Sequence, residues 1–398
     1  MRDQFPQLSE QVYGKRLVYL DNAATSLRPQ RVIDLWDELS SHKNANLHRA
    51  VHHIAAVATE EYESTRDAVR QYLNAEFREE IIFTSGTTAS INLVAFSFGE
   101  AFIGEGDEII VTEAEHHSNI VPWQMLCQRK NAVLKHLEVD DNGHLKYAEL
   151  ENLITPRTKL VCVAHISNVL GLTNPVKNIV NICHSKGCPV LVDGAQGIVH
   201  EAVDVRDLGC DFYVFSGHKV FSAPGVGVLY GKKELLEQMP PYMGGGEMIA
   251  TVRWSGTTYA PLPQKFEAGT QNMAGVPTLK PALELAAELR RNDSDEVRDY
   301  VLDALARNPR IRLFGLPGGE FKKIPLFSFA VEGAHHEDIA LILDKMGVAV
   351  RSGQMCAEPL MDRFGVTGMV RASFAQYNTM QEAEYFIKSL EKAINMLV

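Results

Sequence analysis

The chain has 398 residues, of which 45% are hydrophobic and 22% are charged, and its formal net charge is −11. This ordinary globular composition allows a large core, and the acidic balance argues against nucleic acid or an anionic membrane as the main partner. The first residues, MRDQFPQLSEQVYGKRLVYL, lack the apolar stretch of a signal peptide, and no apolar run approaches the ~20 residues of a membrane span. We therefore expect a cytoplasmic protein whose six cysteines are reduced.

Between about residue 80 and residue 231, short β-rich runs alternate with helical segments. Amphipathic stretches at Thr88–Phe98, Asn119–Arg129 and Val176–Lys186 separate runs of strand character. The alternation is typical of an α/β fold with a mostly parallel sheet and helices on both faces. Ligands of such sheets bind beyond the carboxyl ends of the strands, so the polar residues there are candidates for function. The seven predicted strands are IIFTS, EIIVTE, AVLKHLEV, KLVCVAH, PVLVDGA, FYVFSGH and GVGVLYG.

After Gly231 the pattern changes, and we expect a second, smaller α+β domain. The stretch 243–272 is rich in Gly, Thr and Pro and is interpreted as irregular connection. Two helical stretches follow, TLKPALELAAELRR and DSDEVRDYVLDALARN, and then three strands, KIPLFSFAVEG, VAVRSG and MVRASFAQ. The predicted division is a large domain of residues 15–255 and a small domain of residues 1–14 with 256–398.

Two of the predicted strand ends carry residues suited to holding charged groups. Gly86, Thr87 and Thr88 lie where a strand gives way to a helix, and the free N–H groups of a helix start can cradle a phosphate. An ordinary N-cap is the alternative. Asp193 ends another buried strand, where a carboxylate needs a cation or several donors; it could pair with a protonated ring nitrogen, or serve as an N-cap or in a structural salt bridge.

Ser216, His218 and Lys219 follow the next strand. A lysine in an apolar pocket has a lowered pKa, and its neutral amine can form a Schiff base with an aldehyde. Pyridoxal phosphate requires such a lysine, an acidic partner such as Asp193 for its pyridine nitrogen, and donors for its phosphate. The segment TEAEHHSN adds His116, whose imidazole could stack on the ring. These motifs together predict a pyridoxal-phosphate site.

The motifs resemble those of the class V, fold-type I pyridoxal-phosphate enzymes, and specifically the cysteine desulfurases of the SufS/CsdA type. The resemblance covers nearly the whole chain and implies the fold-type I transferase architecture, with a seven-stranded, mostly parallel sheet. It is carried by YLDNAATSLRP, NLHRAVH, TSGTTASINLVA, EAEHHSNIVPWQ, HISNVLG, VDGAQG, DFYVFSGHK, EAGTQN, RSGQMCAEPL and RASFAQYNT.

By this resemblance, Lys219 carries the cofactor as a Schiff base, Asp193 holds the pyridine nitrogen and His116 stacks on the ring. Asn168 and Gln196 would bond the ring oxygen. The predicted phosphate ligands are Thr87, Thr88, Ser216 and His218, with Thr270 contributed by the other subunit of a homodimer.

Cys356 lies in VAVRSGQMCAEPL after small and polar residues, which predicts a mobile, accessible loop. In the family, a cysteine at this place attacks the substrate sulfur and becomes a persulfide; an incidental loop cysteine is the alternative. Met355 precedes it, where relatives often have His. The resemblance makes Arg371 the clamp for the substrate carboxylate, since a guanidinium matches a carboxylate in a bidentate manner, with Arg351 and Asn168 as further substrate contacts.

The resemblance implies a cysteine desulfurase that takes L-cysteine to L-alanine and passes sulfur from Cys356 to an acceptor protein of the SufE/CsdE type, for the assembly of Fe-S clusters or other sulfur-containing cofactors. A selenocysteine lyase is the nearest alternative. A kynureninase-like or aminotransferase activity would not need Cys356, and a non-catalytic scaffold would not need Lys219, Asp193 and Arg371.

Two weaker patterns are set aside. His48, His52 and His53 have a spacing that a helix could use to bind a metal, but no Cys or carboxylate pattern accompanies them, and no metal site is predicted. The glycines of GVGVLYG miss the G-x-G-x-x-G spacing of dinucleotide-binding folds.

Overall fold

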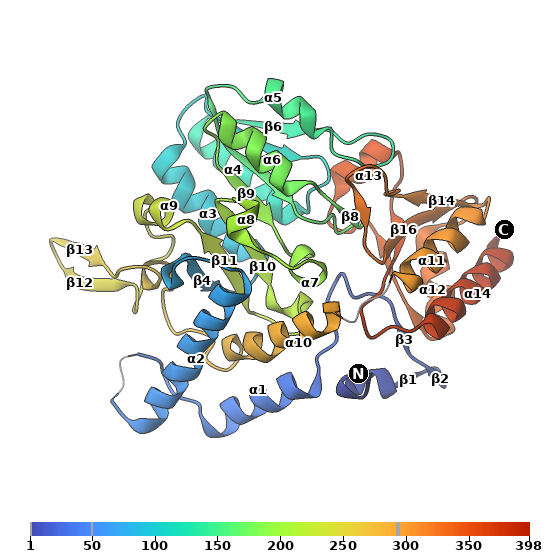
Figure 1. Cartoon of the computed structure of the whole chain (residues 1–398), viewed down its shortest axis with the longest axis horizontal. Helices are drawn as coiled ribbons and strands as arrows, with labels where there is room; N and C mark the ends of the chain where they lie inside the picture. The colour runs from blue at the N-terminus through green and yellow to red at the C-terminus, as the bar shows by residue number, and fades with distance from the viewer. Residues whose placement is uncertain (1, 49–50, 292–294) are drawn as a thin grey trace.

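The computed structural model describes residues 2–48, 51–291 and 295–398. The larger of its two lobes, here the large domain, is built on a seven-stranded sheet in the order β4-β11-β10-β9-β7-β5-β6 (Figure 1). Only β11 runs antiparallel to its neighbours. The predicted α/β class and all seven predicted strands are thus confirmed. The strands are β4 Ile81–Thr84, β5 Glu108–Thr112, β6 Val133–Leu137, β7 Thr158–Ala164, β9 Val190–Asp193, β10 Phe212–Ser216 and β11 Gly227–Gly231.

Both faces of this sheet are buried under helices, because successive side chains of a strand point to opposite faces and here both sets are apolar. In β7, Val161 and Val163 join the core on one face, while Leu160 and Cys162 join the core on the other. One face is covered by α3 Thr87–Phe102 and α4 Val121–Lys130. Helices that contribute to the other core include α2 His53–Tyr72, α6 Val176–Ser185, α7 Gly197–His200, α8 Val205–Leu208 and α10 Leu279–Arg291.

The second lobe, here the small domain, has an antiparallel sheet in the order β14-β16-β19-β18. Its core lies between this sheet and three helices, and it receives Val18 and Leu20 from the chain start. The strands are β14 Ile311–Phe314, β16 Leu326–Val331, β18 Arg351–Gly353 and β19 Met369–Ser373; the helices are α11 Glu296–Arg307, α12 His336–Lys345 and α14 Met380–Leu397.

The chain crosses between the lobes more than once. The short strand β3 Val18–Tyr19 pairs in parallel with β17 Val348–Ala349 beside the small domain. Helix α10 follows residue 255 in the sequence yet packs on α2 of the large domain. The predicted division at residues 15–255 therefore stays a prediction. Residues 293–294 of the second predicted helical stretch lie outside the described residues.

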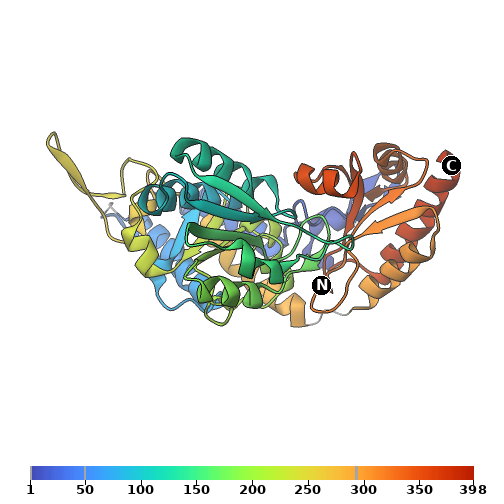
Figure 2. The same cartoon turned by 90° about the horizontal axis from the view of Figure 1, so that it is seen from above.

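The interpretation of residues 243–272 as irregular connection is wrong in part, because β12 Ile249–Arg253 and β13 Gly256–Tyr259 form a hairpin. It projects from the end of the molecule opposite the small domain (Figure 2). Its strands pair only with each other and are exposed on both faces, so the alternation that marks a half-buried strand is missing. VAVRSG, predicted as one strand, is divided between β17 and β18 in two different sheets.

Further helices complete the described chain: α1 Gln30–His42, α5 Leu150–Leu153, α9 Lys233–Gln238 and α13 Glu358–Phe364. Of the helices in the described ranges, none combines the length and the apolar character required to cross a membrane.

Candidate active site

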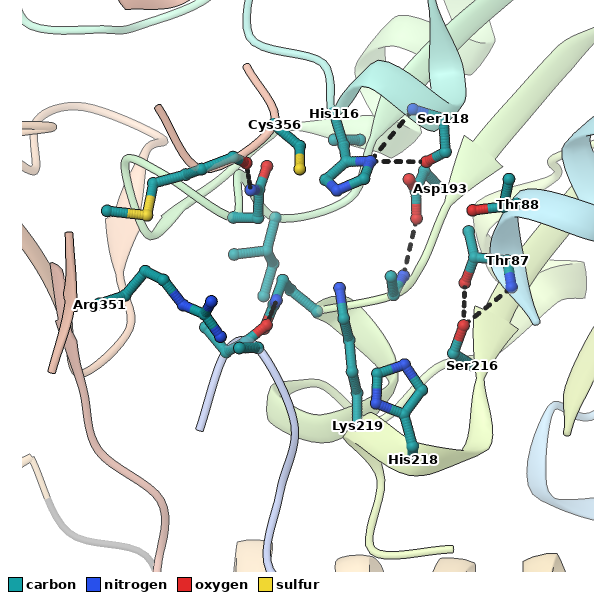
Figure 3. A pocket seen from close by; sticks show the side chains of 18 of the residues that line it. Thr87, Thr88, His116, Ser118, Asp193, Ser216, His218, Lys219, Arg351 and Cys356 are labelled. Carbon is teal, nitrogen blue, oxygen red and sulfur yellow. Dashed lines mark hydrogen bonds between the residues drawn. The ribbon is translucent and has the colours of Figure 1, made fainter. Parts of the chain in front are cut away.

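A cavity of about 290 Å³ lies at the carboxyl ends of the sheet strands, where the two lobes meet. Figure 3 shows Lys219, His116 and Cys356 directed into it. The polar or charged side chains that line it include all but one of the sequence-predicted site residues: Thr87, Thr88, His116, Asn168, Asp193, Gln196, Ser216, His218, Lys219, Arg351, Cys356 and Arg371.

The N-terminus of α3 forms one wall of the cavity. Its N-cap is Gly86, which offers no side chain to the free N–H groups of the first turn. The Thr87 N–H donates to Ser216 Oγ at 2.8 Å, and the two hydroxyls are also 2.8 Å apart (Figure 3). Gly227 makes this geometry possible, since a Cβ there would lie 2.4 Å from Gly86 Cα. The arrangement suits an anion, because the helix dipole is positive at this end.

Asp193 closes β9 and is 5% exposed. Its Oδ1 accepts a hydrogen bond of 2.9 Å from the Ala195 N–H, and no ion pair reaches it from the described part of the chain. Burial raises the pKa of Asp193, and the charge of Lys219 opposes this rise. A buried carboxylate in this condition is suited to a cationic ligand group.

Lys219 ends the short 3₁₀ turn Gly217–Lys219 that follows β10. Burial lowers its pKa from the ordinary 10.5; Asp193 opposes this effect and the positive Arg371 adds to it. The lysine therefore has the lowered amine pKa predicted from the sequence. A larger neutral fraction makes the amine a better nucleophile and base.

His116 is held in one tautomer by its neighbours. The Ser118 N–H donates to His116 Nδ1 at 3.1 Å, and the Ser118 hydroxyl lies 2.8 Å from the same nitrogen. Burial and the nearby charge of Lys219 lower the pKa of His116 to about 4, so the ring is neutral at pH 7. Because Nδ1 accepts from a backbone N–H, the proton of the neutral ring is on Nε2.

Burial also lowers the pKa of His218 to about 4, with Lys219 as the next cause. A neutral His218 can donate one hydrogen bond while accepting another; its Nδ1 lies 3.2 Å from Thr25 Oγ1.

Arg371 lies in β19, 3% exposed, with its guanidinium in the cavity wall. Nη1 donates to the Asn168 carbonyl at 2.8 Å and Nη2 to Asp21 Oδ1 at 3.3 Å, while the buried Nε has no partner. Burial lowers the pKa of Arg371 to about 10, so it is charged at pH 7. The Nε–H is thus a buried donor without a partner among the described residues.

Asp21 is the residue that sequence reasoning missed. It pairs with Arg351 at 2.7 Å as well as with Arg371, and so holds two cations together beside the cavity. The sequence contained a usable pattern, since Asp21 directly follows the apolar run LVYL, as Asp193 follows its strand. Its partners, however, are more than 300 residues away.

Cys356 is exposed, as predicted, whereas the other five cysteines are buried. Burial raises the pKa of the Cys127 thiol to about 11 and that of Cys188 to about 12. Met355 and Cys356 both have left-handed backbone, with φ of 54° and 55°. Their carbonyls accept from Asn168 Nδ2 at 2.9 Å and from the His117 N–H at 2.7 Å. The predicted mobility of this loop stays a prediction.

Thr270 is the predicted site residue that does not line this cavity. It borders a separate cavity with residues such as Ser85, Gln271 and Asn272. Its predicted place in the site of a second subunit stays a prediction.

The helical spacing of His48, His52 and His53 is not realised, because α2 begins only at His53. His48 instead lies 2.9 Å from Glu63, and His52 caps the helix. Arg49 and Ala50 of the NLHRAVH motif lie outside the described residues.

Comparison with known proteins assigns this chain and its fold to a family. The family described as "Aminotransferase class-V" matches residues 18–386, and the chain belongs to this family. A full-length relative is the probable cysteine desulfurase of Vibrio cholerae, 44% identical over 100% of this chain and 98% of that protein.

Two solved structures share the whole fold. The cysteine desulfurase CsdA of Escherichia coli, in an S-sulfonic acid form, has a TM-score of 0.91 and 40% identity. The apo cysteine desulfurase of Thermococcus onnurineus has a TM-score of 0.93 and 35% identity. Each comparison covers 100% of this chain and 98% of the other. The family resemblance and the fold inferred from the motifs are thereby confirmed.

Proposed function

We propose that this chain is a pyridoxal-phosphate-dependent cysteine desulfurase that converts L-cysteine to L-alanine and takes the sulfur onto Cys356. The observation that carries this proposal is that an exposed thiol, Cys356, lines the same cavity as Lys219 and Arg371. A thiol to receive sulfur, an amine to move the α-proton and a cation to hold the α-carboxylate are the groups that this reaction needs. The full-length relatives and structural neighbours support the same activity.

The residues of the cavity fit pyridoxal phosphate. Asp193 is a buried carboxylate without an ion-pair partner among the described residues, and a protonated pyridine nitrogen would supply that partner. The first turn of α3 with Ser216 and His218 offers donors for the phosphate, and Lys219 offers the amine that binds the aldehyde. When bound, pyridoxal phosphate supplies an electrophilic carbon and a ring that withdraws electrons from the substrate Cα.

Three charged residues of the cavity have separate roles in substrate binding and proton transfer. Arg371, whose guanidinium lies in the cavity wall, binds the α-carboxylate of L-cysteine and orients Cα. Lys219 Nζ, whose pKa is lowered, accepts the α-proton and later returns a proton to the organic product. Asp193, ionised opposite a cation, keeps a proton on the pyridine nitrogen and so maintains its electron demand.

Cys356 performs the sulfur step. Its thiolate attacks the substrate sulfur, a new S–S bond forms, the Cβ–S bond breaks, and the electron pair of that bond remains with the carbon fragment that is released as alanine. The balance is one L-cysteine and one thiol in, one L-alanine and one persulfide out. His116, which is neutral and has its ring proton on Nε2, exchanges protons near the substrate sulfur.

The further proposals concern partners and compartment. We infer a homodimer in which Thr270 supports the phosphate of the other subunit, an acceptor protein of the SufE/CsdE type that removes the persulfide sulfur, and a cytoplasmic setting. The unpaired state of the six cysteines supports a reducing compartment.

Purified protein incubated with L-cysteine and a reductant tests the activity. We expect alanine and sulfide in equal amounts. Alanine without sulfide, or neither product, would contradict the proposal. Turnover of selenocysteine combined with failure on cysteine would favour the selenocysteine lyase alternative.

A further inference from the structure

The small domain holds the loop 168–171 of the large domain by its backbone carbonyls. This loop follows β7 and carries Asn168 into the cavity. Each of its four successive carbonyls accepts one hydrogen bond from a different donor. The pairs are Arg371 Nη1 to Asn168 at 2.8 Å, Ser328 Oγ to Val169 at 2.5 Å, Lys323 Nζ to Leu170 at 2.6 Å and the Ile324 N–H to Gly171 at 2.9 Å.

Lys323 is an unusual member of this set, because the residue is only 4% exposed and no carboxylate pairs with it in the described part of the chain. Besides Leu170, its Nζ donates to the carbonyls of Gly315 at 2.8 Å and Phe314 at 3.4 Å. Burial lowers the pKa of Lys323 to about 7. Three carbonyl oxygens match the three N–H donors of the ammonium form, so the loop contact is strongest when the lysine is charged.

Ser328 lies beside Arg371, the predicted clamp for the substrate carboxylate, and contacts the same loop as Lys323. It lies in β16 directly opposite Arg371 in β19, and cross-strand partners project from the same face of a sheet. The two side chains therefore reach adjacent carbonyls of one loop. Asn168, in turn, donates from Nδ2 to the carbonyl of Met355, next to Cys356.

The loop 168–171 has little room to move. Gly171 has φ +61°, and a Cβ there would lie 2.8 Å from the Leu326 carbonyl. Strands β8 Leu172–Thr173 and β15 Lys322–Lys323 also pair across the same junction. A shift of this loop would change the position of the Arg371 guanidinium, because Nη1 is bonded to it.

We propose that Ser328 and Lys323 are positioning residues for substrate binding: by holding the Val169 and Leu170 carbonyls, they set Asn168 and the Arg371 guanidinium against the substrate carboxylate. Neither residue lines the cavity. The inference rests on the proposed role of Arg371.

The test compares the holoenzyme variants Ser328→Ala and Lys323→Met with Lys322→Met, which removes the exposed neighbouring lysine. Each proposed variant should raise the KM for L-cysteine about fivefold, with a smaller change in kcat. A change of this size corresponds to the free energy contributed by one hydrogen bond. The absorbance of the bound cofactor should not change. Amide hydrogen exchange should rise in peptides covering residues 166–173 and remain as in the wild type elsewhere, and Lys322→Met should match the wild type.

An unchanged KM with unchanged exchange at 166–173 in both variants would overturn the inference. So would a uniform rise in exchange across the small domain, because that would show a general loss of stability. Wild-type turnover of L-cysteine is measured first: its absence would contradict the proposed function, whereas the exchange measurement tests the loop contacts whatever the activity.

Discussion

Burial and a few neighbouring charges set the pKa values of single side chains in this cavity. The pKa of the half-buried Lys219 is lowered by desolvation and by the charge of Arg371, and Asp193 opposes this effect. His116 stays neutral because burial and Lys219 disfavour its charged form. Cys356 differs from the other cysteines in exposure, so under the proposed function it is the thiol that can pass sulfur to another protein.

The first prediction concerns Lys219. Lys219→Ala should contain no cofactor that borohydride fixes to the protein and should show no turnover, because the amine that binds the aldehyde and moves the α-proton is gone. Peptide mapping of reduced wild-type protein is the control, and it should place the adduct on Lys219. An adduct on a different lysine would refute the assignment.

The second prediction concerns Cys356. Cys356→Ser should bind the cofactor and exchange the substrate α-proton, since those steps use Lys219, but it should form no protein persulfide from L-cysteine. Trapping with an alkylating agent and mapping the peptides measures this. Cys127→Ala is the matched control and should behave as the wild type, since the Cys127 thiol is buried. Extra sulfur on a buried cysteine would contradict the proposal.

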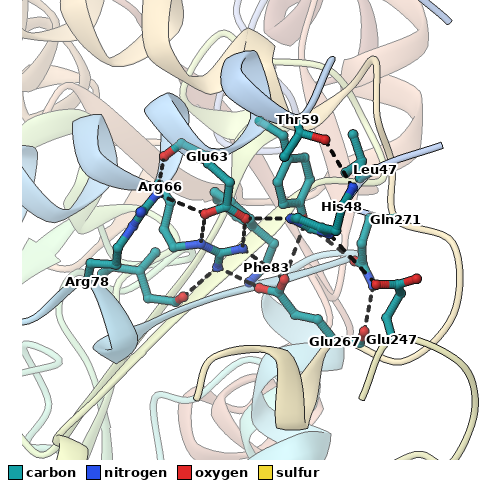
Figure 4. A network of polar contacts seen from close by, with 12 residues as sticks. Leu47, His48, Thr59, Glu63, Arg66, Arg78, Phe83, Glu247, Glu267 and Gln271 are labelled. Carbon is teal, nitrogen blue, oxygen red and sulfur yellow. Dashed lines mark hydrogen bonds and ion pairs between the residues drawn. The ribbon is translucent and has the colours of Figure 1, made fainter. Parts of the chain in front are cut away.

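At the scale of elements, the site depends on how closely two segments approach. The N-terminus of α3 lies at the cavity because Gly227 of β11, which has no side chain, lets the backbone of Gly86, the N-cap of α3, approach closely. Helix α2 is held differently, by a polar network around the buried Arg66 (Figure 4). Arg66 Nη1 donates to Glu267 Oε1 at 2.7 Å, and that carboxylate also accepts from the Phe83 N–H of β4.

Gly227→Ala should therefore lose cofactor. The added Cβ would lie 2.4 Å from Gly86 Cα, a contact that only a backbone shift at the start of α3 can relieve. We expect a lower pyridoxal phosphate content and weaker rebinding of the cofactor, both measured by absorbance. Gly244→Ala is the control, since nothing lies within 4 Å of a Cβ there. Equal cofactor retention in the two variants would show that the phosphate site at the start of α3 tolerates the backbone shift.

Glu63, in the network of Figure 4, should make the free energy of unfolding depend on pH in the acidic range. Burial alone would raise its pKa, but hydrogen bonds from His48 and Arg66 lower the pKa of Glu63 to about 2. A carboxylate whose folded pKa lies below its unfolded value stabilises the fold above the unfolded pKa, and this stability is lost as pH falls through the folded value.

Glu63→Gln should then lower the free energy of unfolding at pH 7 by on the order of 3 kcal/mol and flatten its change between about pH 5 and pH 2. Denaturant titrations at several pH values measure both effects. Glu60→Gln, an exposed change on the same helix, is the control. If the free energy of unfolding changed with pH in parallel for Glu63→Gln and the wild type, the Glu63 carboxylate would not be the source of the acid dependence.

At the scale of the whole molecule, the cavity lies between two lobes, and each supplies part of it. The large domain contributes Lys219, Asp193 and the start of α3, and the small domain contributes Arg371 and Cys356. Thr270 borders a different cavity, so under the proposed function a second subunit has to bring it to the phosphate.

A mixed dimer tests this arrangement. One subunit carries Lys219→Ala and the other carries Thr270→Ala, and the two are separated by different affinity tags. If Thr270 serves the partner's site, the subunit with intact Lys219 receives an intact Thr270, and the mixed dimer should show about half of wild-type activity with normal cofactor affinity. Weakened cofactor binding at that site would place Thr270 in its own subunit's cavity.

Much of the fold and the candidate site could be predicted because the relevant patterns are local. Apolar runs of strand length predicted all seven strands of the large sheet. Residues that end or closely follow these strands, such as Asp193, Ser216 and Lys219, lie in one cavity because the ends of parallel strands share an edge. The hairpin β12–β13 was missed for the same reason, since its exposed strands have no burial pattern.

The sequence by itself determined the order of strands and helices along the chain and the residues at the strand ends, because backbone preference and hydrophobic period are properties of neighbouring residues. It also indicated the family, through motifs that resemble those of known enzymes. Only the tertiary structure decided which distant groups meet. Asp21 joins Arg351 and Arg371 across more than 300 residues, Arg66 meets Glu267 across 201, and Lys323 reaches the carbonyl of Leu170 across 153. Such contacts depend on the path of the chain between two packed lobes, and burial there sets their strength and the protonation of the groups involved.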